Sequence, residues 1–185
     1  MKTDEANRNI KLLVPNMNRG SSVMQALANR RSIREYAEDA LSLQDLSDLM
    51  WAACGINRPE TGNVTAPSAM NYQDVTVYAC FESASYTYNK YTHSLDFVSD
   101  GDIRPDEAPV VLVLVTEGNE YWNAIDAGIV SENISLFCAA VDLANYPRAT
   151  LDHESMKTAL KLSGKQVIML CHPILLQRLF IRRIY

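Results

Sequence analysis

The sequence predicts an α+β domain in which helices and strands occupy separate layers. The expected elements follow the order helix, helix, strand, hairpin, strand, helix, helix, strand, which is typical of this class. Two stretches support the prediction most: residues 109–116 are an almost unbroken apolar run, as in a strand buried on both faces, and residues 122–143 have a mostly apolar helical pattern. Because the chain has 185 residues, 48% of them hydrophobic, we expect one domain spanning residues 1–185.

The composition argues against several classes of function. The net charge of -5 argues against nucleic acid as the main partner. The three histidines lie far apart and show no metal-ligand spacing, so no metal site is expected. The four cysteines are scattered among mostly apolar neighbours, which favours buried free thiols in a reducing compartment. These residues are Cys54, Cys80, Cys138, Cys171, His93, His153 and His172.

The sequence contains no recognisable export or membrane signal. Residues 1–18 are polar and lack the apolar core of a signal peptide. The longest apolar run, residues 108–115, is too short to span a bilayer. We therefore expect a cytoplasmic protein that does not associate with a membrane. A chain from which an export signal had been removed would read the same way, so that alternative stays open.

The N-terminal part is expected to be an arm followed by a short helix. Residues 1–20 read as an irregular arm, because proline, asparagine and glycine interrupt regular structure. Ser21 or Ser22 is placed to cap a short helix, and this helix is expected to end near Asn29.

A second helix is expected to begin at Ser42, which stands in a capping-box-like spacing with Asp45. Apolar residues then recur at helical intervals as far as Gly55, a residue type that commonly follows helix C-termini. Residues 56–68 are rich in proline, glycine, asparagine and threonine, and they are expected to form a loop.

The strands expected in the middle of the chain are marked by β-branched and aromatic residues. Residues 75–81 have this composition and predict a strand. Residues 86–88 and 91–93 flank the dipeptide at 89–90, which suggests a hairpin. Residues 109–116 predict the buried strand described above.

The long helix over residues 122–143 is apolar on most sides, which indicates a central position or a subunit interface. It must end before Pro147, because the residue preceding a proline disfavours helical geometry. Asp152 is placed to cap the next helix, with Leu151 and Met156 as a hydrophobic staple. The C-terminal boundary of that helix is expected at the next glycine, at position 164, and residues 166–171 predict the last strand.

The most unusual stretch is the basic cluster at residues 30–34, called here the arginine segment. A guanidinium group presents a planar fork of donors that matches the oxygens of a phosphate. In an extended segment alternate residues share a face, so Arg30, Ser32 and Arg34 are expected to form an anion cradle. A basic cluster is more often a solvated patch, and the residues alone leave that alternative open.

Together with other motifs, the arginine segment resembles the FMN-dependent nitroreductase family. The resemblance covers residues 23–173, and the motifs occur in the family's order. They are Arg30-Arg31-Ser32-Ile33-Arg34-Glu35-Tyr36, Leu41-Ser42, Leu49-Met50-Trp51-Ala52-Ala53, Ala66-Pro67-Ser68-Ala69 with Asn71, Ala108-Pro109, Asp126-Ala127-Gly128 and His172-Pro173.

The resemblance implies a three-layer α/β/α sandwich around a mainly antiparallel sheet, and a homodimer with FMN at its interface. The arginine segment would bind the FMN phosphate, ribityl chain and pyrimidine edge. Residues 67–71 would line the isoalloxazine, from the partner subunit, and residues 147–150 would approach flavin N5. The cofactor-binding residues implied in this way are Arg30, Arg31, Ser32, Arg34, Pro67, Ser68, Ala69, Met70, Asn71, Gln73, Pro147, Arg148, Ala149 and Thr150.

The implied activity is hydride transfer from NAD(P)H through flavin N5 to small electron-poor acceptors such as nitroaromatics or quinones, with ping-pong kinetics. The flavin supplies this chemistry, so no catalytic side chain is required. Two alternatives remain open at this point. One is a non-catalytic protein that binds or stores FMN, and the other is a flavin-dependent dehydrogenase like those that form azolines.

The chain departs from the family's pattern in two places. The long helix is followed by Asp142-Leu143-Ala144 where the family usually has Gly-Leu-Gly, so the turn there needs another solution. The family's closing His-Pro-x-Gly-Tyr is interrupted, and residues 174–185 instead form a C-terminal extension rich in apolar and basic side chains. Docking of this extension on the partner subunit, with Arg182 or Arg183 reaching the phosphate, and an unpacked tail are both open.

Overall fold

The computed structural model describes residues 8–34, 40–105 and 107–176. Its helices are α1 (Val23–Asn29), α2 (Leu43–Cys54), α3 (Tyr121–Ala140) and α4 (His153–Ala159), with a 3₁₀ turn at Ala69–Asn71. Its strands are β1 (Ile10–Lys11), β2 (Ile56–Arg58), β3 (Asn63–Val64), β4 (Thr76–Cys80), β5 (Ala84–Asn89), β6 (Ser94–Asp100), β7 (Val110–Thr116), β8 (Leu143–Asn145) and β9 (Val167–Leu176).

Seven strands form one sheet in the order β1-β6-β5-β4-β7-β9-β8, and every neighbouring pair is antiparallel. The remaining two, β2 and β3, form a separate hairpin. The mainly antiparallel sheet and the α+β class are therefore confirmed.

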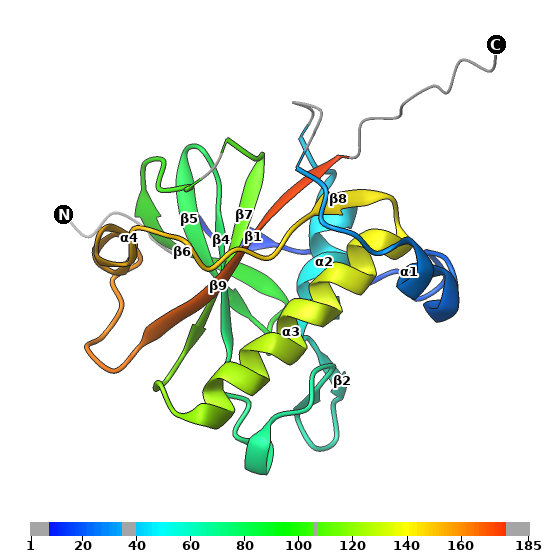
Figure 1. The fold of residues 1–185 in the computed structure, drawn as a ribbon, viewed down its shortest axis with the longest axis horizontal. Coiled ribbons are helices and arrows are strands. Elements are labelled where there is room, and N and C mark those ends of the chain that lie inside the picture. Colours follow the sequence, from blue (N-terminus) through cyan, green and yellow to red (C-terminus); the bar gives the residue numbers. More distant parts are fainter. Residues whose placement is uncertain (1–7, 35–39, 106, 177–185) are drawn as a thin grey trace.

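The sheet has a hydrophobic core on each face, because successive side chains of a strand point to opposite sides. Leu112 and Leu114 of β7 face the core formed with α2 and α3, whereas Val111 and Val113 face the core formed with α4. Figure 1 shows α1, α2 and α3 together on one side of the molecule and α4 on the other. This arrangement is the expected three-layer sandwich, with the larger helical layer on the α3 side.

Strand β7 lies near the centre of the sheet, between β4 and β9, and all seven of its residues are buried. A strand that is covered on both faces has no position for a solvated side chain, so its sequence shows no polar alternation. The strand expected over residues 109–116 is thus confirmed.

The helix starts agree with the predicted capping residues. Ser22 caps α1 and forms a capping box with Gln25, Ser42 caps α2 by accepting the Asp45 N–H, and Asp152 caps α4. Helix α3 ends at Ala140, three residues before the expected boundary. The turn there is made by Asp142 at φ = 60°, a left-handed conformation that aspartate adopts more readily than most residues.

Several short elements differ from the predictions. The arm contains β1, which pairs with β6, and the expected loop over residues 56–68 contains the β2–β3 hairpin. Residues 91–93 lie in the turn between β5 and β6 and are not part of a strand. Strands β1, β2 and β3 have only two or three residues, and the turn at residues 91–93 is polar, so hydrophobic periodicity did not indicate these elements.

The C-terminal part also differs in its boundaries. Helix α4 ends at Ala159, before Gly164, and Lys161 at φ = 54° takes the left-handed position after it. Strand β9 continues to Leu176, so residues 174–176 of the expected extension belong to the sheet. The rest of the extension, residues 177–185, and Glu35 and Tyr36 of the matched motif lie outside the described residues.

Gly55 follows α2 for a reason other than the one expected, because its φ of -72° is open to any residue. A Cβ atom at this position would lie 2.7 Å from the Trp51 Cα, well inside van der Waals contact. The neighbouring backbone, and not a left-handed turn, therefore requires glycine.

We expect Gly55→Ala to lower the free energy of unfolding by about 1–3 kcal/mol, the usual cost of overpacking. Urea denaturation measures this loss. Gly164→Ala is the matched control, because an added Cβ there meets no atom within 4 Å and its unfolding free energy should be unchanged or slightly higher. Equal effects of the two substitutions would contradict the clash.

Among the described residues, no helix is both long and apolar enough to cross a membrane.

Candidate functional site

The arginine segment borders a cavity of about 310 Å³ at the C-terminal end of α3, next to β8. Arg30 and Arg31 line this cavity, which we call the arginine cavity. The residues around them come from α1, the arginine segment, α3, the turn after α3 and β8. They are Ala28, Asn29, Ile33, Ser135, Ala139, Asp142, Leu143 and Asn145.

The arrangement within the arginine segment differs from the alternation that was expected. Arg30 is the C-cap of α1, and its N–H donates to the Ala26 carbonyl, so an extended geometry begins only after it. Ile33 turns toward the core on the α4 side of the sheet. The cavity is therefore lined by two consecutive arginines and does not include Ser32 or Arg34 in its lining.

The backbone around Asn145 holds the second half of the arginine segment. The Ile33 N–H donates to the Asn145 carbonyl at 3.0 Å. The Arg34 guanidinium lies 4.9 Å from the centre of the Tyr146 ring, which is a cation–π geometry. Asn145, at the end of β8, thus holds Ile33, and Tyr146, the next residue, contacts Arg34.

The charges of Arg30 and Arg31 are not neutralised within the described part of the chain. Neither forms an ion pair with a described carboxylate, whereas Arg19 binds Asp45 and Asp48, and Arg104 binds Asp102. Both arginine side chains are exposed to solvent at the mouth of the cavity. Their donors are therefore available to an anion such as a phosphate group.

The second predicted group, residues 67–73, lies at the opposite end of α3. The Ala69 N–H donates to both oxygens of Asp126, at 2.9 and 3.1 Å, and the Gln73 N–H donates to Ser68 Oγ at 2.8 Å. Met70, Asn71 and Gln73 all have φ near +50°, which is uncommon for residues other than glycine. Strained backbone of this kind is concentrated at functional sites.

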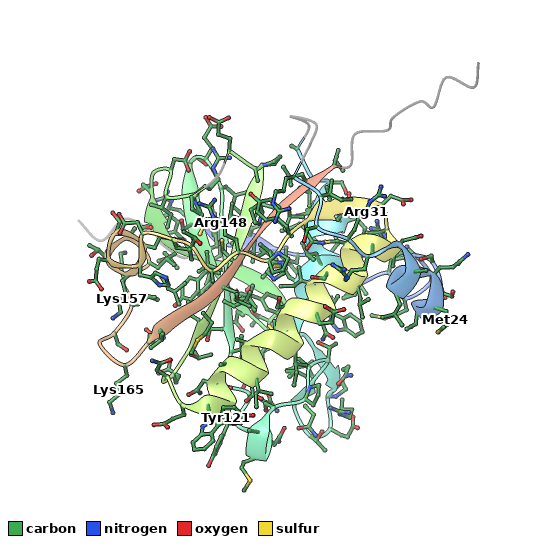
Figure 2. The ribbon with its side chains drawn as sticks, viewed as in Figure 1. Met24, Arg31, Tyr121, Arg148, Lys157 and Lys165 are labelled. Atoms are coloured by element: carbon green, nitrogen blue, oxygen red, sulfur yellow. The ribbon has the colours of Figure 1, made fainter. Side chains whose placement is uncertain are left out.

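The two predicted groups line separate cavities at different levels of α3. Helix α3 has 20 residues, which corresponds to a length of about 30 Å. Figure 2 shows Arg31 near the C-terminal end of α3 and Tyr121 at the opposite end, where residues 67–73 are anchored. Asp126, which anchors residues 67–73, precedes Ser135 and Ala139 of the arginine cavity by 9 and 13 residues, a rise of about 14–20 Å along α3.

The third predicted group, residues 147–150, continues the edge of the sheet beyond β8. Arg148 pairs with Cys171 of β9 through two backbone hydrogen bonds of 2.9 and 2.8 Å. Its guanidinium donates to the carbonyls of Thr150 and Pro105. Arg148 thus fastens this loop to the sheet, and its exposed neighbours at 147, 149 and 150 are left at the surface.

Sequence reasoning missed the residues that α3 and β8 contribute to the arginine cavity. Ser135 and Ala139 lie in the long helix with no local sign of a site, and Asn145 belongs to a strand that was not expected. Only the tertiary contact between α3 and β8 brings them to the arginines. Among the described residues, no group of three or more histidine, cysteine, aspartate or glutamate side chains is placed to hold a metal ion.

A pair of carboxyl groups lies beneath residues 67–73. Asp126 is 1% exposed, accepts the Ala69 N–H at both of its oxygens and lies beside Asp74. Asp74 accepts a hydrogen bond from Asn123 Nδ2, and its buried Oδ1 meets no donor among the described residues. Burial, together with the nearby Asp74 carboxylate, raises the pKa of Asp126.

This raised pKa predicts a stability that falls with increasing pH. An unfolded aspartate has a pKa of about 3.9, so the folded chain retains a proton at Asp126 that the unfolded chain has lost. The resulting stabilisation is complete below about pH 4 and disappears as the pH rises through the folded pKa. We expect Asp126→Asn to remove this part of the pH dependence, measured by urea denaturation across the pH range.

Asp152→Asn is the control, because asparagine also caps helices and Asp152 is exposed. An Asp126→Asn variant with the same pH profile as the wild type would show that the pKa of Asp126 is not raised.

Comparison with known proteins identifies relatives of this chain. The sequence model of the nitroreductase family matches residues 27–104. The structure of a provisionally named nitroreductase from Ralstonia eutropha JMP134 is 30% identical, with a TM-score of 0.87, and the match covers 92% of this chain and 90% of that one.

Two further relatives are more distant. A provisionally named nitroreductase from Methanocaldococcus jannaschii is 24% identical over 177 residues, covering 80% of this chain and 87% of the relative. A nitroreductase with bound FMN from Bacteroides fragilis shares the fold, with 17% identity, a TM-score of 0.61 and coverage of 85% of this chain and 89% of that one.

Proposed function

Because the chain belongs to the nitroreductase family, we propose that it is an FMN-dependent oxidoreductase that uses NAD(P)H to reduce small electron-poor acceptors such as nitroaromatics or quinones. One observation carries the proposal: Arg30 and Arg31 line a cavity of about 310 Å³ and form no ion pair with any carboxylate that the structure describes. On a chain with a net charge of -5, such a local excess of positive charge indicates a dedicated anion site.

The residues present fit the phosphate end of FMN. Arg30 and Arg31 would bind its oxygens through charge-assisted hydrogen bonds, and the polar side chains of Asn29, Ser135 and Asn145 supply further partners along the cavity. When bound, FMN supplies the hydride chemistry, so the chain has to provide binding, orientation and an electrostatic environment. The lack of a recognisable catalytic triad in the sequence is consistent with this division.

The flavin ring would contact residues 67–73 of the partner subunit. Asp126, which holds these residues, precedes Ser135 and Ala139 of the arginine cavity by about 14–20 Å along α3, and we assign residues 67–73 to the other subunit's site. A two-fold axis across α3, with the two helices antiparallel, places the N-terminal end of one helix beside the C-terminal end of the other. Each subunit then gives an arginine cavity to one site and a 67–73 segment to the other.

The surface of the single chain has apolar side chains where such a dimer needs them. They lie on α1, on the 3₁₀ turn and on the first turns of α3, and each is at least 44% exposed. Patches of this kind mark protein–protein interfaces. The residues are Val23, Met24, Leu27, Met70, Tyr72, Tyr121, Trp122 and Ile125.

Gly128 lies on the same exposed side of α3, and an added Cβ there would meet no atom of its own chain. Glycine within a helix costs roughly 1 kcal/mol relative to alanine. A glycine with unfilled space around it is explained by the close approach of a second helix, which supports an interface at this point.

The absorption spectrum of the purified protein tests the cofactor, because bound flavin absorbs visible light. Anaerobic addition of NADH or NADPH then tests the activity. We expect the flavin absorption to bleach and to return when a quinone or a nitroaromatic compound is added. A protein that carries FMN but does not bleach would be a binding or storage flavoprotein, and a protein that cannot be loaded with FMN would refute the proposal.

A further inference from the structure

His172 is a fully buried polar residue that contacts Asn145, one of the residues lining the arginine cavity. It lies in the middle of β9, is 0% exposed and points toward α3. Ser131 Oγ of α3 lies 2.8 Å from His172 Nε2, and Asn145 Oδ1 of β8 lies 3.4 Å from His172 Nδ1. His172 therefore connects the long helix to the edge strand through the interior of the protein.

The partners of the ring determine where its proton lies. An amide oxygen can only accept, so His172 Nδ1 carries the hydrogen and donates it to Asn145 Oδ1. Nε2 then accepts from the Ser131 hydroxyl, which is free to donate. Burial lowers the pKa of His172 to about 3, so the ring stays neutral and this pattern persists at physiological pH.

The chain of contacts continues from Asn145 to the arginine segment. The Asn145 side chain also lies beside the Cys138 thiol of α3. Its backbone carbonyl accepts the Ile33 N–H at 3.0 Å, and its side chain lines the arginine cavity. A shift of Asn145 would therefore move Ile33 and the two arginines that precede it.

A buried histidine at this position lowers the stability of the fold, so its presence indicates a functional role. Two residues away on either side, Leu170 and Ile174 of β9 face the same core and are apolar. Burying a polar ring among such neighbours costs free energy that hydrogen bonds only offset. A polar residue among apolar core residues is typical of functional positions.

We propose that His172 is a positioning residue for the arginine cavity: through Asn145 it holds Ile33, and so orients Arg30 and Arg31 toward the anion. The nature of that anion as FMN phosphate rests on the proposed function. The positioning itself is a property of this chain and can be measured without the cofactor.

Two amide substitutions separate the two sides of the ring. The asparagine amide nitrogen is bonded to Cγ, like Nδ1, and can donate to Asn145, whereas the glutamine amide nitrogen is one atom further out, like Nε2, and cannot. We expect His172→Asn to keep the dissociation constant for FMN within about threefold of the wild type. His172→Gln should raise it roughly tenfold or more, the effect of displacing a binding group by a fraction of an ångström to an ångström.

Hydrogen exchange at the Ile33 amide gives a readout independent of FMN. His172→Gln should accelerate this exchange, because the Asn145 carbonyl that protects it moves, and His172→Asn should not. Leu95→Ala, a buried change in β6 on the opposite face of the sheet from Ile33, is the control: it should lower stability without changing Ile33 exchange or FMN affinity.

If His172→Gln does not fold, Asn145→Ala takes its place, since it removes the same contact and leaves His172 intact. It should accelerate Ile33 exchange in the same way. The proposal is overturned if the glutamine and asparagine variants behave alike in both measurements, or if Asn145→Ala leaves Ile33 exchange unchanged. A wild-type protein that binds no FMN but shows the expected exchange pattern would refute only the proposed function.

Discussion

A variant in which Arg30 and Arg31 are both replaced by alanine is expected to be purified without FMN. Charge-assisted hydrogen bonds contribute about 1.5–3 kcal/mol each, so the loss of two amounts to about 3–6 kcal/mol. This raises the dissociation constant by roughly two to four orders of magnitude. Neither side chain forms an ion pair with a described residue or is buried, so the unfolding free energy should change little.

The ratio of flavin to protein after dialysis, together with a calorimetric titration, measures this effect. Lys157→Ala combined with Lys165→Ala is the matched control, because it removes the same charge at a place far from the arginine cavity, as Figure 2 shows. The control should retain its FMN. Full retention by the arginine variant would place the phosphate elsewhere on the chain.

Replacing Ile125 with arginine is expected to dissociate the proposed dimer and, with it, to release the proposed flavin. Ile125 is 44% exposed on the N-terminal part of α3, where the interface is proposed. Obligate interfaces are mostly apolar and typically bury more than about 2,000 Å², and a buried guanidinium without a partner costs several kcal/mol. Loss of FMN follows because the partner's 67–73 segment leaves the site.

Sedimentation should then show a wild-type dimer and a variant that migrates as a monomer of 20.7 kDa. Tyr91→Arg is the control, since Tyr91 is 78% exposed in the turn between β5 and β6, outside the proposed interface. A wild-type protein that is already monomeric at micromolar concentration would contradict the shared site.

Local signals in the sequence were sufficient for the main elements of the fold. The apolar run of β7 and the serine and aspartate caps of α1, α2 and α4 report interactions within a few residues of themselves, so they can be read without tertiary information. Strands of two or three residues, such as β1 and β8, are too short to show a hydrophobic periodicity. They form because a longer neighbouring strand pairs with them.

The candidate site was predictable to a similar degree. Composition located the arginine segment, but strand alternation did not describe its geometry, because Arg30 still belongs to the end of α1. The contributions of Ser135 and Asn145 depend on the packing of α3 against β8, which no local pattern encodes. The separation of the two predicted groups along α3 also became clear only from the fold.

The position of β9 in the sheet has a consequence for synthesis of the protein on the ribosome. Strand β9 is the last strand described, yet it lies between β7 and β8 and pairs with β7 over seven residue pairs. Until it emerges, the most apolar strand of the nascent chain has one unpaired edge, and β8 has no partner. Residue 176 must therefore leave the ribosome before the sheet can close, and until then the nascent chain exposes an unpaired strand edge, a feature that promotes aggregation.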